Sequence, residues 1–545
     1  MKKIFFFALF VLCTLLLVGC DDSKNATFKL NLDGYSELRE KLEFRLTLSD
    51  PDSQLEKTSV KGILSKKGTE DTLVTKTVSF DSNKSATVTF TSLNPDTEYT
   101  VEFYAGYNGK KVSLLKADYK TSDEGTLENP YKITKYSDFD TYRNEKNGHF
   151  ILANDIDFEG KQISPWFSSA FTGTFDGNEK KILNFKLSIL DEENNDTYSS
   201  SSNQYYGFFG NIGEGAKIFN LELSNFEIHV QRSSTKNTGS YAKSIFYYGI
   251  LAGYCAGNIE NVNVTDSKIY VKSTNTNPQV FKVGGLVGNL YGKGTIKNCS
   301  VDADIFVEGS VDVSVGGIAG TTKYAELLTE EVEGVKQYVP NISGSSYTGT
   351  IDVKLSGSES KQSQTAVGGL VGKNSEAIII DCTADVEFNL TSSFEEANGQ
   401  SIFVGGLVGK NINDNSKVQN CNVTASFNVE TYDKPTEENK LNIYLGLIAG
   451  QNGGDSASSS AIITNCTFTP KSENNIKIYD DSNVVYNFDV VGKEVEGTKL
   501  QEVVLTSDVS LNVAKYTLTQ DSETGEDQYV PSGEPSTETI YTLKV

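Results

Sequence analysis

Residues 284–288 read Gly-Gly-Leu-Val-Gly, and residues 296–301 read Ile-Lys-Asn-Cys-Ser-Val. The first of these motifs recurs at residues 316–320, 368–372 and 405–409, and in weaker form at 207–210, 249–253 and 446–450. The last glycines of the copies fall at positions 210, 253, 288, 320, 372, 409 and 450. An interval of about 40 residues with variable insertions indicates an array of repeats whose insertions form loops.

The second motif follows each glycine copy and places apolar residues at alternate positions. Its copies are Ile182-x-Asn184-Phe185, Ile218-x-Asn220-Leu221, Ile259-x-Asn261-Val262, Ile296-x-Asn298-Cys299, Ile342-Ser343-Gly344-Ser345, Ile380-Asp381-Cys382, Val418-x-Asn420-Cys421 and Ile463-x-Asn465-Cys466. Alternation predicts a strand with one buried face, and recurrence once per repeat stacks equivalent residues at the strand spacing of about 4.8 Å.

This pattern predicts a parallel β-helix, in which each coil covers the backbone edges of its neighbours. The Leu, Val and Ile residues between the glycines should point inward, and the glycines should lie at bends close to the next coil. A β-propeller has repeats of similar length, but its blades need four strands joined by antiparallel hairpins. The repeats do not show those hairpins, so we expect an all-β chain containing a parallel β-helix.

Three upstream segments lead into the repeats: residues 125–131 (Gly-Thr-Leu-Glu-Asn-Pro-Tyr), 151–158 (Ile-Leu-Ala-Asn-Asp-Ile-Asp-Phe) and 171–178 (Phe-Thr-Gly-Thr-Phe-Asp-Gly-Asn). Together with the repeats, this succession resembles the bacterial surface β-helices that carry the GLUG repeat. The resemblance covers about residues 125–470 and implies a right-handed parallel β-helix with an adhesin-like role. The repeat fades beyond Pro470, so residues 471–545 are expected to form a C-terminal β capping region. A strand within 484–491 or 500–505 would cover the last coil.

The N-terminus has the pattern of an export signal. Lys2 and Lys3 precede an apolar stretch of 14 residues, Ile4 to Leu17, which is short for a helix that spans a bilayer. It ends in Leu17-Val18-Gly19-Cys20, which resembles the bacterial lipobox. The resemblance implies cleavage of residues 1–19, lipid attachment at Cys20 and a lipidated tether over residues 20–25. An ordinary signal peptide with a chance cysteine is the alternative. On the lipobox reading the membrane is a partner through the lipid, and the protein is extracytoplasmic in the bacterial envelope, at the cell surface.

Residues 26–121 have the alternating pattern of a β-sandwich, for example at Leu42, Phe44, Leu46 and Leu48. The run from Leu93 to Val101 resembles the fibronectin type III signature, with Tyr99 as the tyrosine-corner residue that bonds back to the backbone. The usual buried Trp is absent, and Phe44 is the candidate to take its place. Another seven-stranded sandwich is the alternative. Either domain would serve as a spacer or binding module.

Composition restricts the classes of function. Acidic residues number 72 against 49 Lys plus Arg, giving a net charge of −23, which argues against a nucleic-acid partner. Cys299, Cys382, Cys421 and Cys466 occupy a repeat position that other coils fill with Phe, Leu, Val or Ser, so we expect a buried slot of inert thiols rather than a metal site. Cys299 and Cys382 should be unpaired, because the coil of Ser345 separates them. No cofactor or metal is predicted.

Carboxylates that precede the repeats are the candidates for catalysis. Asp155, Asp157 and Asp176 are the candidates, but Asp155 and Asp157 flank an inward Ile156 and should share a solvent face, while Asp176-Gly177 is a turn dipeptide. The GLUG-bearing family includes IgA-cleaving metallopeptidases that need His-Glu-x-x-His. The chain has only His149 and His229, and neither lies in that motif. No catalytic residue is therefore assigned.

Two classes of function follow. The first is a non-catalytic, lipid-anchored surface protein that binds a host or bacterial surface protein or a glycan. The second is a polysaccharide lyase or hydrolase that uses surface carboxylates. Recognition could reside in two insertions. Residues 191–204 should form a projecting polar loop, and residues 321–340 should form a short helix or a hairpin.

Overall fold

The computed structural model describes residues 27–55, 60–69, 71–162, 164–167, 169–190, 203–232, 245–273, 280–309, 311–323, 328–332, 335–357, 364–394, 400–432, 440–454, 460–479, 484–520 and 527–540. It divides into two compact units, Met1–Pro130 and Tyr131–Val545, and each is taken by itself below. Cys20 and the signal-like segment lie outside the described residues, as do residues 191–202 of the first insertion.

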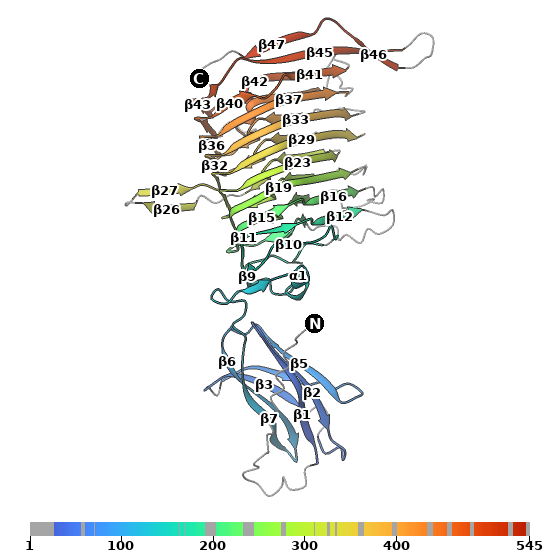
Figure 1. Cartoon of the computed structure of the whole chain (residues 1–545), viewed down its shortest axis with the longest axis vertical. Coiled ribbons are helices and arrows are strands. Elements are labelled where there is room, and N and C mark those ends of the chain that lie inside the picture. Colours follow the sequence, from blue (N-terminus) through green and yellow to red (C-terminus); the bar gives the residue numbers. More distant parts are fainter. Residues whose placement is uncertain are drawn as a thin grey trace. The chain divides into compact units, whose positions relative to one another are not determined.

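The N-terminal unit contains two antiparallel sheets around one core (Figure 1). One sheet has the order β1-β2-β5 and the other β4-β3-β6-β7. The strands are β1 (Lys29–Leu38), β2 (Lys41–Ser49), β3 (Lys61–Lys66), β4 (Thr72–Thr77), β5 (Ser85–Thr91), β6 (Glu98–Tyr107) and β7 (Lys110–Lys120). Phe44 is fully buried at the centre, with its ring 5.6 Å from that of Phe103 and 4.7 Å from that of Tyr119. Phe44 therefore fills the centre of the core, as predicted.

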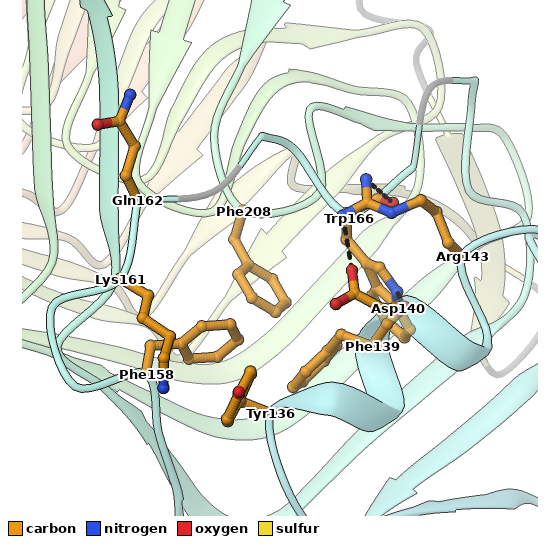
Figure 2. A pocket seen from close by; sticks show the side chains of 9 residues that line it. All are labelled: Tyr136, Phe139, Asp140, Arg143, Phe158, Lys161, Gln162, Trp166 and Phe208. Atoms are coloured by element: carbon orange, nitrogen blue, oxygen red, sulfur yellow. Dashed lines mark hydrogen bonds and ion pairs between the residues drawn. The ribbon is translucent and has the colours of Figure 1, made fainter.

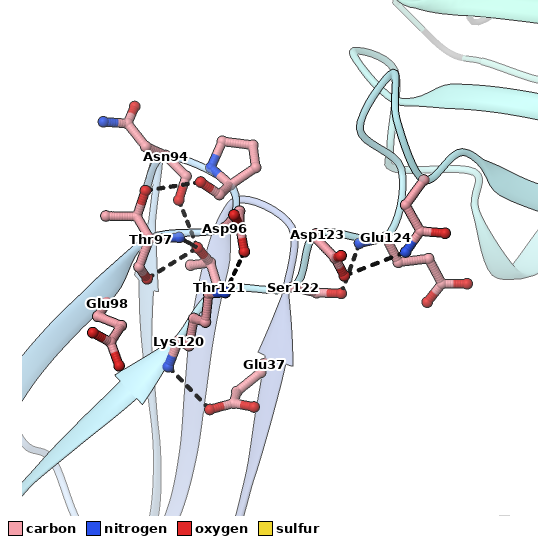
Figure 3. A network of polar contacts seen from close by, with 12 residues as sticks. Glu37, Asn94, Asp96, Thr97, Glu98, Lys120, Thr121, Ser122, Asp123 and Glu124 are labelled. Atoms are coloured by element: carbon pink, nitrogen blue, oxygen red, sulfur yellow. Dashed lines mark hydrogen bonds and ion pairs between the residues drawn. The ribbon is translucent and has the colours of Figure 1, made fainter.

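Tyr99 makes the predicted bond back to the backbone, because its hydroxyl accepts a hydrogen bond from the Asn94 amide at 2.9 Å. Figure 3 shows the polar contacts around the same turn. Buried Thr121, directly after β7, accepts the Thr97 amide proton at 2.9 Å and donates its hydroxyl proton to the Asn94 carbonyl at 2.6 Å. These bonds tie the loop before β6 to the end of the last strand.

The second unit is a parallel β-solenoid, which confirms the predicted fold class. One coil consists of β20 (Val280–Gly284), β21 (Val287–Tyr291), β22 (Thr295–Lys297) and β23 (Ser300–Gly309). Each of these strands pairs in parallel with its equivalents in the neighbouring coils, and Figure 1 shows the strands lying one above another. Alternate side chains, including Phe281, Val283 and Val301, point into the core.

The other strands of the stack repeat this arrangement. The coils before it use β8 (Tyr131–Ile133), β9 (His149–Leu152), β10 (Ile156–Asp157), β11 (Thr174–Leu183), β12 (Lys186–Leu190), β13 (Gln204–Tyr206), β14 (Asn211–Ile212), β15 (Lys217–Ser224), β16 (Glu227–Arg232), β17 (Ile245–Gly249), β18 (Ala252–Cys255) and β19 (Asn258–Ser273). The coils after it use β24 (Val311–Gly316), β25 (Ala319–Lys323), β28 (Ile342–Ser343), β29 (Ser346–Gly357), β30 (Gln364–Gly368), β31 (Val371–Ser375), β32 (Ile378–Ile380), β33 (Thr383–Phe394), β34 (Ser401–Gly405), β35 (Val408–Ile412), β36 (Lys417–Gln419), β37 (Asn422–Thr431), β38 (Leu441–Asn452), β39 (Ile462–Thr464), β40 (Thr467–Pro470) and β41 (Asn474–Tyr479).

The glycine motif forms a corner where adjacent coils approach closely. A Cβ atom on Gly406 would lie 2.1 Å from the carbonyl oxygen of Leu447, and one on Gly369 would lie 2.2 Å from that of Gly406. The leucine that follows each of them, Leu370 or Leu407, is fully buried. The predicted reason for the glycines, close approach of the next coil, is therefore confirmed.

The asparagine of the second motif forms another corner. Asn184, Asn220, Asn261, Asn298, Asn420 and Asn465 all have φ between +51° and +57°. Gly344 and Asp381 take the same conformation in the coils that lack the asparagine, with φ of +56° and +55°. These are the residue types that tolerate the left-handed region best, so the motif contains Asn because the backbone turns there.

Both ends of the stack differ from the repeats. At the first coils, α1 (Ser137–Thr141) buries Phe139, whose carbonyl accepts a hydrogen bond from the indole of Trp166 at 2.7 Å. After β41, parallel stacking continues through β42 (Val484–Glu494), β43 (Lys499–Gln501), β44 (Val504–Leu505) and β45 (Val509–Gln520). Antiparallel pairing with β45 begins only at β46 (Asp527–Pro531) and β47 (Ser536–Ile540).

The residues expected to start a cap at 471 thus add one more coil, because strand alternation persists after the glycine motif has faded. Strands within 484–491 and 500–505 do cover the last coil that has a glycine motif, as predicted, because β42 pairs with β38, β43 with β39 and β44 with β40. In the second insertion, β26 (Leu328–Val332) and β27 (Val335–Val339) pair antiparallel, so the hairpin alternative is the one found. Among the described residues, no helix has the length and apolar character needed to cross a membrane.

Candidate functional site

The carboxylates singled out in the sequence each hold a turn of the first coils. Asp155 and Asp157 are exposed on either side of buried Ile156, as predicted. Asp155 Oδ1 accepts the amide proton of Lys181 at 2.9 Å, and Asp176 Oδ1 accepts that of Asn178 at 2.8 Å. These carboxylates therefore have a structural role, because each accepts a hydrogen bond from a backbone amide in a turn.

Asp157 has the fullest set of partners. Its Oδ1 atom accepts hydrogen bonds from the Asn184 side chain at 2.8 Å and from the Glu159 amide at 2.6 Å. These bonds, that of Asn184 first, hold the pKa of the Asp157 carboxyl below its ordinary value. A carboxyl that is ionised at neutral pH is a poor proton donor for glycoside cleavage.

A different group of carboxylates lies on the outer face of the solenoid. Asp302 and Asp304 are two residues apart on β23 and therefore share its solvent side. Partial burial, Asp266 and Asp304 raise the pKa of Asp302, whereas the Asp304 carboxylate accepts the Thr350 amide proton at 3.2 Å. The Asp302-x-Asp304 spacing equals that of Asp155-x-Asp157, so the sequence alone could have identified this pair as a candidate. Its neighbour Asp266 could not be identified in this way, because it comes from the preceding coil.

The histidines and cysteines have structural surroundings. His149 Nδ1 lies 2.8 Å from Thr174 Oγ1, and the His229 ring packs against Tyr270 with centroids 4.7 Å apart. Among the described residues, no group of three His, Cys, Asp or Glu side chains could hold a metal ion.

The repeat cysteines Cys299, Cys382, Cys421 and Cys466 are free and buried, which confirms the thiol slot. The Ser345 hydroxyl accepts the Cys299 amide proton at 3.1 Å, so Ser345 occupies the level next to Cys299, as predicted. Cys255, which lies outside the repeat position, is also buried, and burial raises the pKa of its thiol to about 12.

Sequence reasoning missed a hollow of about 340 Å³ beneath the short helix α1 (Figure 2). Its floor consists of aromatic rings that come from separate segments: Phe139, Phe158, Trp166 and Phe208. Tyr136, which is 38% exposed, lines its outer side. The scattered aromatic residues give no local motif, because only the closure of the first coils brings them together.

Charged and amide groups line the rim of this hollow, with Lys161 and Gln162 opposite Asp140 and Arg143 in Figure 2. Arg143 donates to the Asp140 carboxylate at 3.2 Å, and Lys161 Nζ lies 2.6 Å from a Glu159 oxygen and 3.9 Å from the centre of the Tyr136 ring. A second hollow of about 340 Å³ adjoins Gln162 and is lined by Ser164, Pro165, Leu187, Ser188, Ile189 and Tyr206. Two neighbouring hollows with aromatic and polar walls can hold a small organic ligand.

Comparisons with known proteins agree with the repeat motif. The family model described as "The GLUG motif" matches residues 282–305 and 363–391, and no curated protein sequence matches the chain. A solved structure named "IgA1 Protease" aligns with 88% of this chain at 13% identity and a TM-score of 0.30. The chain spans 31% of that protein's length, and this distant likeness carries no information about activity. The chain thus contains GLUG motifs within a parallel β-solenoid.

Proposed function

We propose that this chain is a lipid-anchored bacterial surface protein that presents its β-solenoid for adhesion, binding a surface protein or glycan without catalysis. The observation that carries the proposal is the order of parts along the chain. Leu17-Val18-Gly19-Cys20 precedes a short polar segment and then two compact β units. A tether followed by rigid modules suits presentation of a binding surface away from a membrane.

The N-terminal unit is proposed as a fibronectin type III-like spacer. The strand orders β1-β2-β5 and β4-β3-β6-β7 support this assignment, as does the bond from the Asn94 amide to the Tyr99 hydroxyl. The turn-holding roles of Asp155, Asp157 and Asp176 support a non-catalytic solenoid.

The anchor can be tested by growing the producing bacterium with an alkyne fatty acid and detecting the labelled protein. Cys20→Ala should abolish labelling and leave the uncleaved precursor, because no thiol remains at the lipobox. Cys13→Ala is the matched control, since Cys13 lies in the same leader, and it should label as the wild type does. Equal labelling of wild type and Cys20→Ala would refute lipidation at Cys20.

A polysaccharide-active enzyme is the second candidate function, and Asp302 is the observation that favours it. Partial burial and the neighbouring Asp266 and Asp304 raise the pKa of the Asp302 carboxyl, and a raised carboxyl pKa suits the proton donor of a glycosidase. If the chain cleaves a polysaccharide, Asp302→Asn should abolish cleavage without lowering the melting temperature. Unchanged cleavage in that variant would exclude this group as the catalytic centre.

A further inference from the structure

We infer that the two hollows at the first coils of the solenoid form a paired subsite for two consecutive rings of a neutral oligosaccharide. This inference rests on the proposed binding function and assigns it a place and a ligand class. Both hollows measure about 340 Å³, and the Gln162 side chain lines both. The two hollows therefore adjoin at Gln162, and a two-ring ligand that occupies both would cross this residue.

The walls suit a pyranose ring. One face of a sugar ring consists of C–H groups with slight positive charge, and these groups pack favourably against the electron-rich face of an aromatic ring. In the first hollow the aromatic ring that a sugar can reach is that of Tyr136, which is 38% exposed, whereas the rings of Phe139, Phe158, Trp166 and Phe208 behind it are at most 3% exposed. The second hollow combines the Tyr206 ring with the polar Ser164 and Ser188.

The charges at the rim favour a neutral ligand. Arg143 is paired with Asp140, and Lys161 is paired with Glu159, so each cation already has a carboxylate at hydrogen-bond distance. A sulfated or uronic-acid ring would compete with these carboxylates for the same cations, whereas a hydroxyl group can bond to ion pairs without breaking them.

Acceptors for sugar hydroxyls are present at the rims of the two hollows. Gln162 uses its amide nitrogen to bond the Ser188 carbonyl at 3.1 Å, and Asp140 uses Oδ1 to bond Arg143. In the part of the chain that the structure describes, Gln162 Oε1 and Asp140 Oδ2 carry no hydrogen bond. Asp140 Oδ2 is thus an acceptor at the rim of the first hollow, and Gln162 Oε1 is an acceptor on the side that faces the second hollow.

Hydrogen bonds also hold the walls in place before a ligand binds. Arg143 donates to the carbonyls of Pro165 and Trp166 at 3.1 and 3.2 Å, and the Trp166 indole donates to the Phe139 carbonyl. A site that is formed in advance loses little conformational entropy on binding.

Trp166 provides the test, because it is the single Trp of the chain and lines the first hollow. Purified full chain is titrated with maltose, cellobiose and lactose, and its intrinsic fluorescence is followed. At least one of these neutral disaccharides should give a saturable change, with a dissociation constant lower than that of glucose. Tyr136→Ala and Gln162→Ala should each raise this constant by about tenfold or more. Lys135→Ala, an exposed neighbour of Tyr136 that does not line the hollow, should leave it unchanged.

Several results would overturn the inference. One is the absence of a saturable change with any of the three disaccharides while the melting temperature stays that of the native chain. Another is stronger binding of glucuronic acid or toluene than of every neutral sugar, which would assign the hollows to an anion or an apolar group. A third is equal binding by the Gln162→Ala variant. None of these results depends on lipid labelling at Cys20, so loss of the anchor and loss of the sugar site are separately detectable.

Discussion

The asparagine of the second repeat motif is the residue that most directly links this sequence to its backbone. At Asn420, φ is +53°, and the side-chain amide donates to the Asp381 carboxylate at 3.1 Å. Asn465 in the next coil has φ of +51° and donates to Asn420 Oδ1 at 2.8 Å. The same residue thus relieves a strained corner and joins consecutive coils.

Replacing Asn420 separates these two effects. Asn420→Ala should lower the free energy of unfolding by about 1–3 kcal/mol, because alanine is strained at positive φ and the side-chain hydrogen bonds between coils (the ladder bonds) are lost. Asn420→Gly should cost less, since glycine adopts this conformation freely. Asn428→Ala is the control, because it loses a ladder bond to Asn389 outside the left-handed region. Chemical denaturation followed by circular dichroism would measure the free energy of unfolding of all three variants. Equal losses for Asn420→Ala and Asn420→Gly would contradict the claim that positive φ strains alanine at this position.

Asp157 predicts a pH dependence of stability. Its folded pKa is below the ordinary value, so its stabilising contribution is fully present above the ordinary pKa of about 4 and is lost as pH falls through the folded pKa. The melting temperatures of wild type and Asp157→Ala should therefore differ at pH 7 and converge in acid. Fluorescence of Trp166, the single Trp of the chain, would report both transitions. A difference that persists unchanged below pH 2 would contradict this assignment.

For single residues, the sequence predicted the role of a position where that position recurs in several coils. The cysteine slot was predictable because other coils place Phe185, Leu221 or Val262 at the same position. The left-handed conformation at the Asn corner was not predicted, although Asn, Asp and Gly replace one another at this repeat position. The partners of Asp157 were not predictable either, because Asn184 reaches it across a corner between strands.

At the scale of elements, the glycine corner makes a clear prediction. Leu407 is fully buried, so Leu407→Asp should lower stability by more than about 4 kcal/mol, since it places an unpaired charge in the core. Leu190→Asp is the matched control, because Leu190 is 60% exposed and should tolerate the charge. Thermal unfolding of the full chain measures both. A melting temperature for Leu407→Asp equal to that of the control would contradict the inward register.

The elements were predictable where the repeat is regular and less so at the ends. Alternation and glycine spacing predicted the parallel strands from β17 to β41. The added coil from β42 to β45 was not expected, because the glycine corner degenerates to Val490-Val491-Gly492 while the strand pattern continues. Whether residues 328–339 form a helix or a hairpin required the structure.

At the scale of the whole molecule, the solenoid acts as a scaffold in which many polar side chains form hydrogen bonds within its own turns. The carboxylates of Asp155, Asp157 and Asp176 bond turns. The paired hollows arise where the stack begins and α1 covers its first coils, so no repeat contains them. This explains why repeats alone predict the fold but not the candidate site, which depends on residues from several segments of the non-repetitive coils.

The central claim is that the solenoid binds a ligand without transforming it. The most direct measurement incubates purified full chain, and its Asp302→Asn variant, with neutral and acidic polysaccharides and follows new reducing ends and unsaturated uronates over time. We predict no release above the protein-free reaction for either chain. Release by the wild type that disappears in Asp302→Asn, at an unchanged melting temperature, would contradict the claim and identify a polysaccharide-cleaving enzyme.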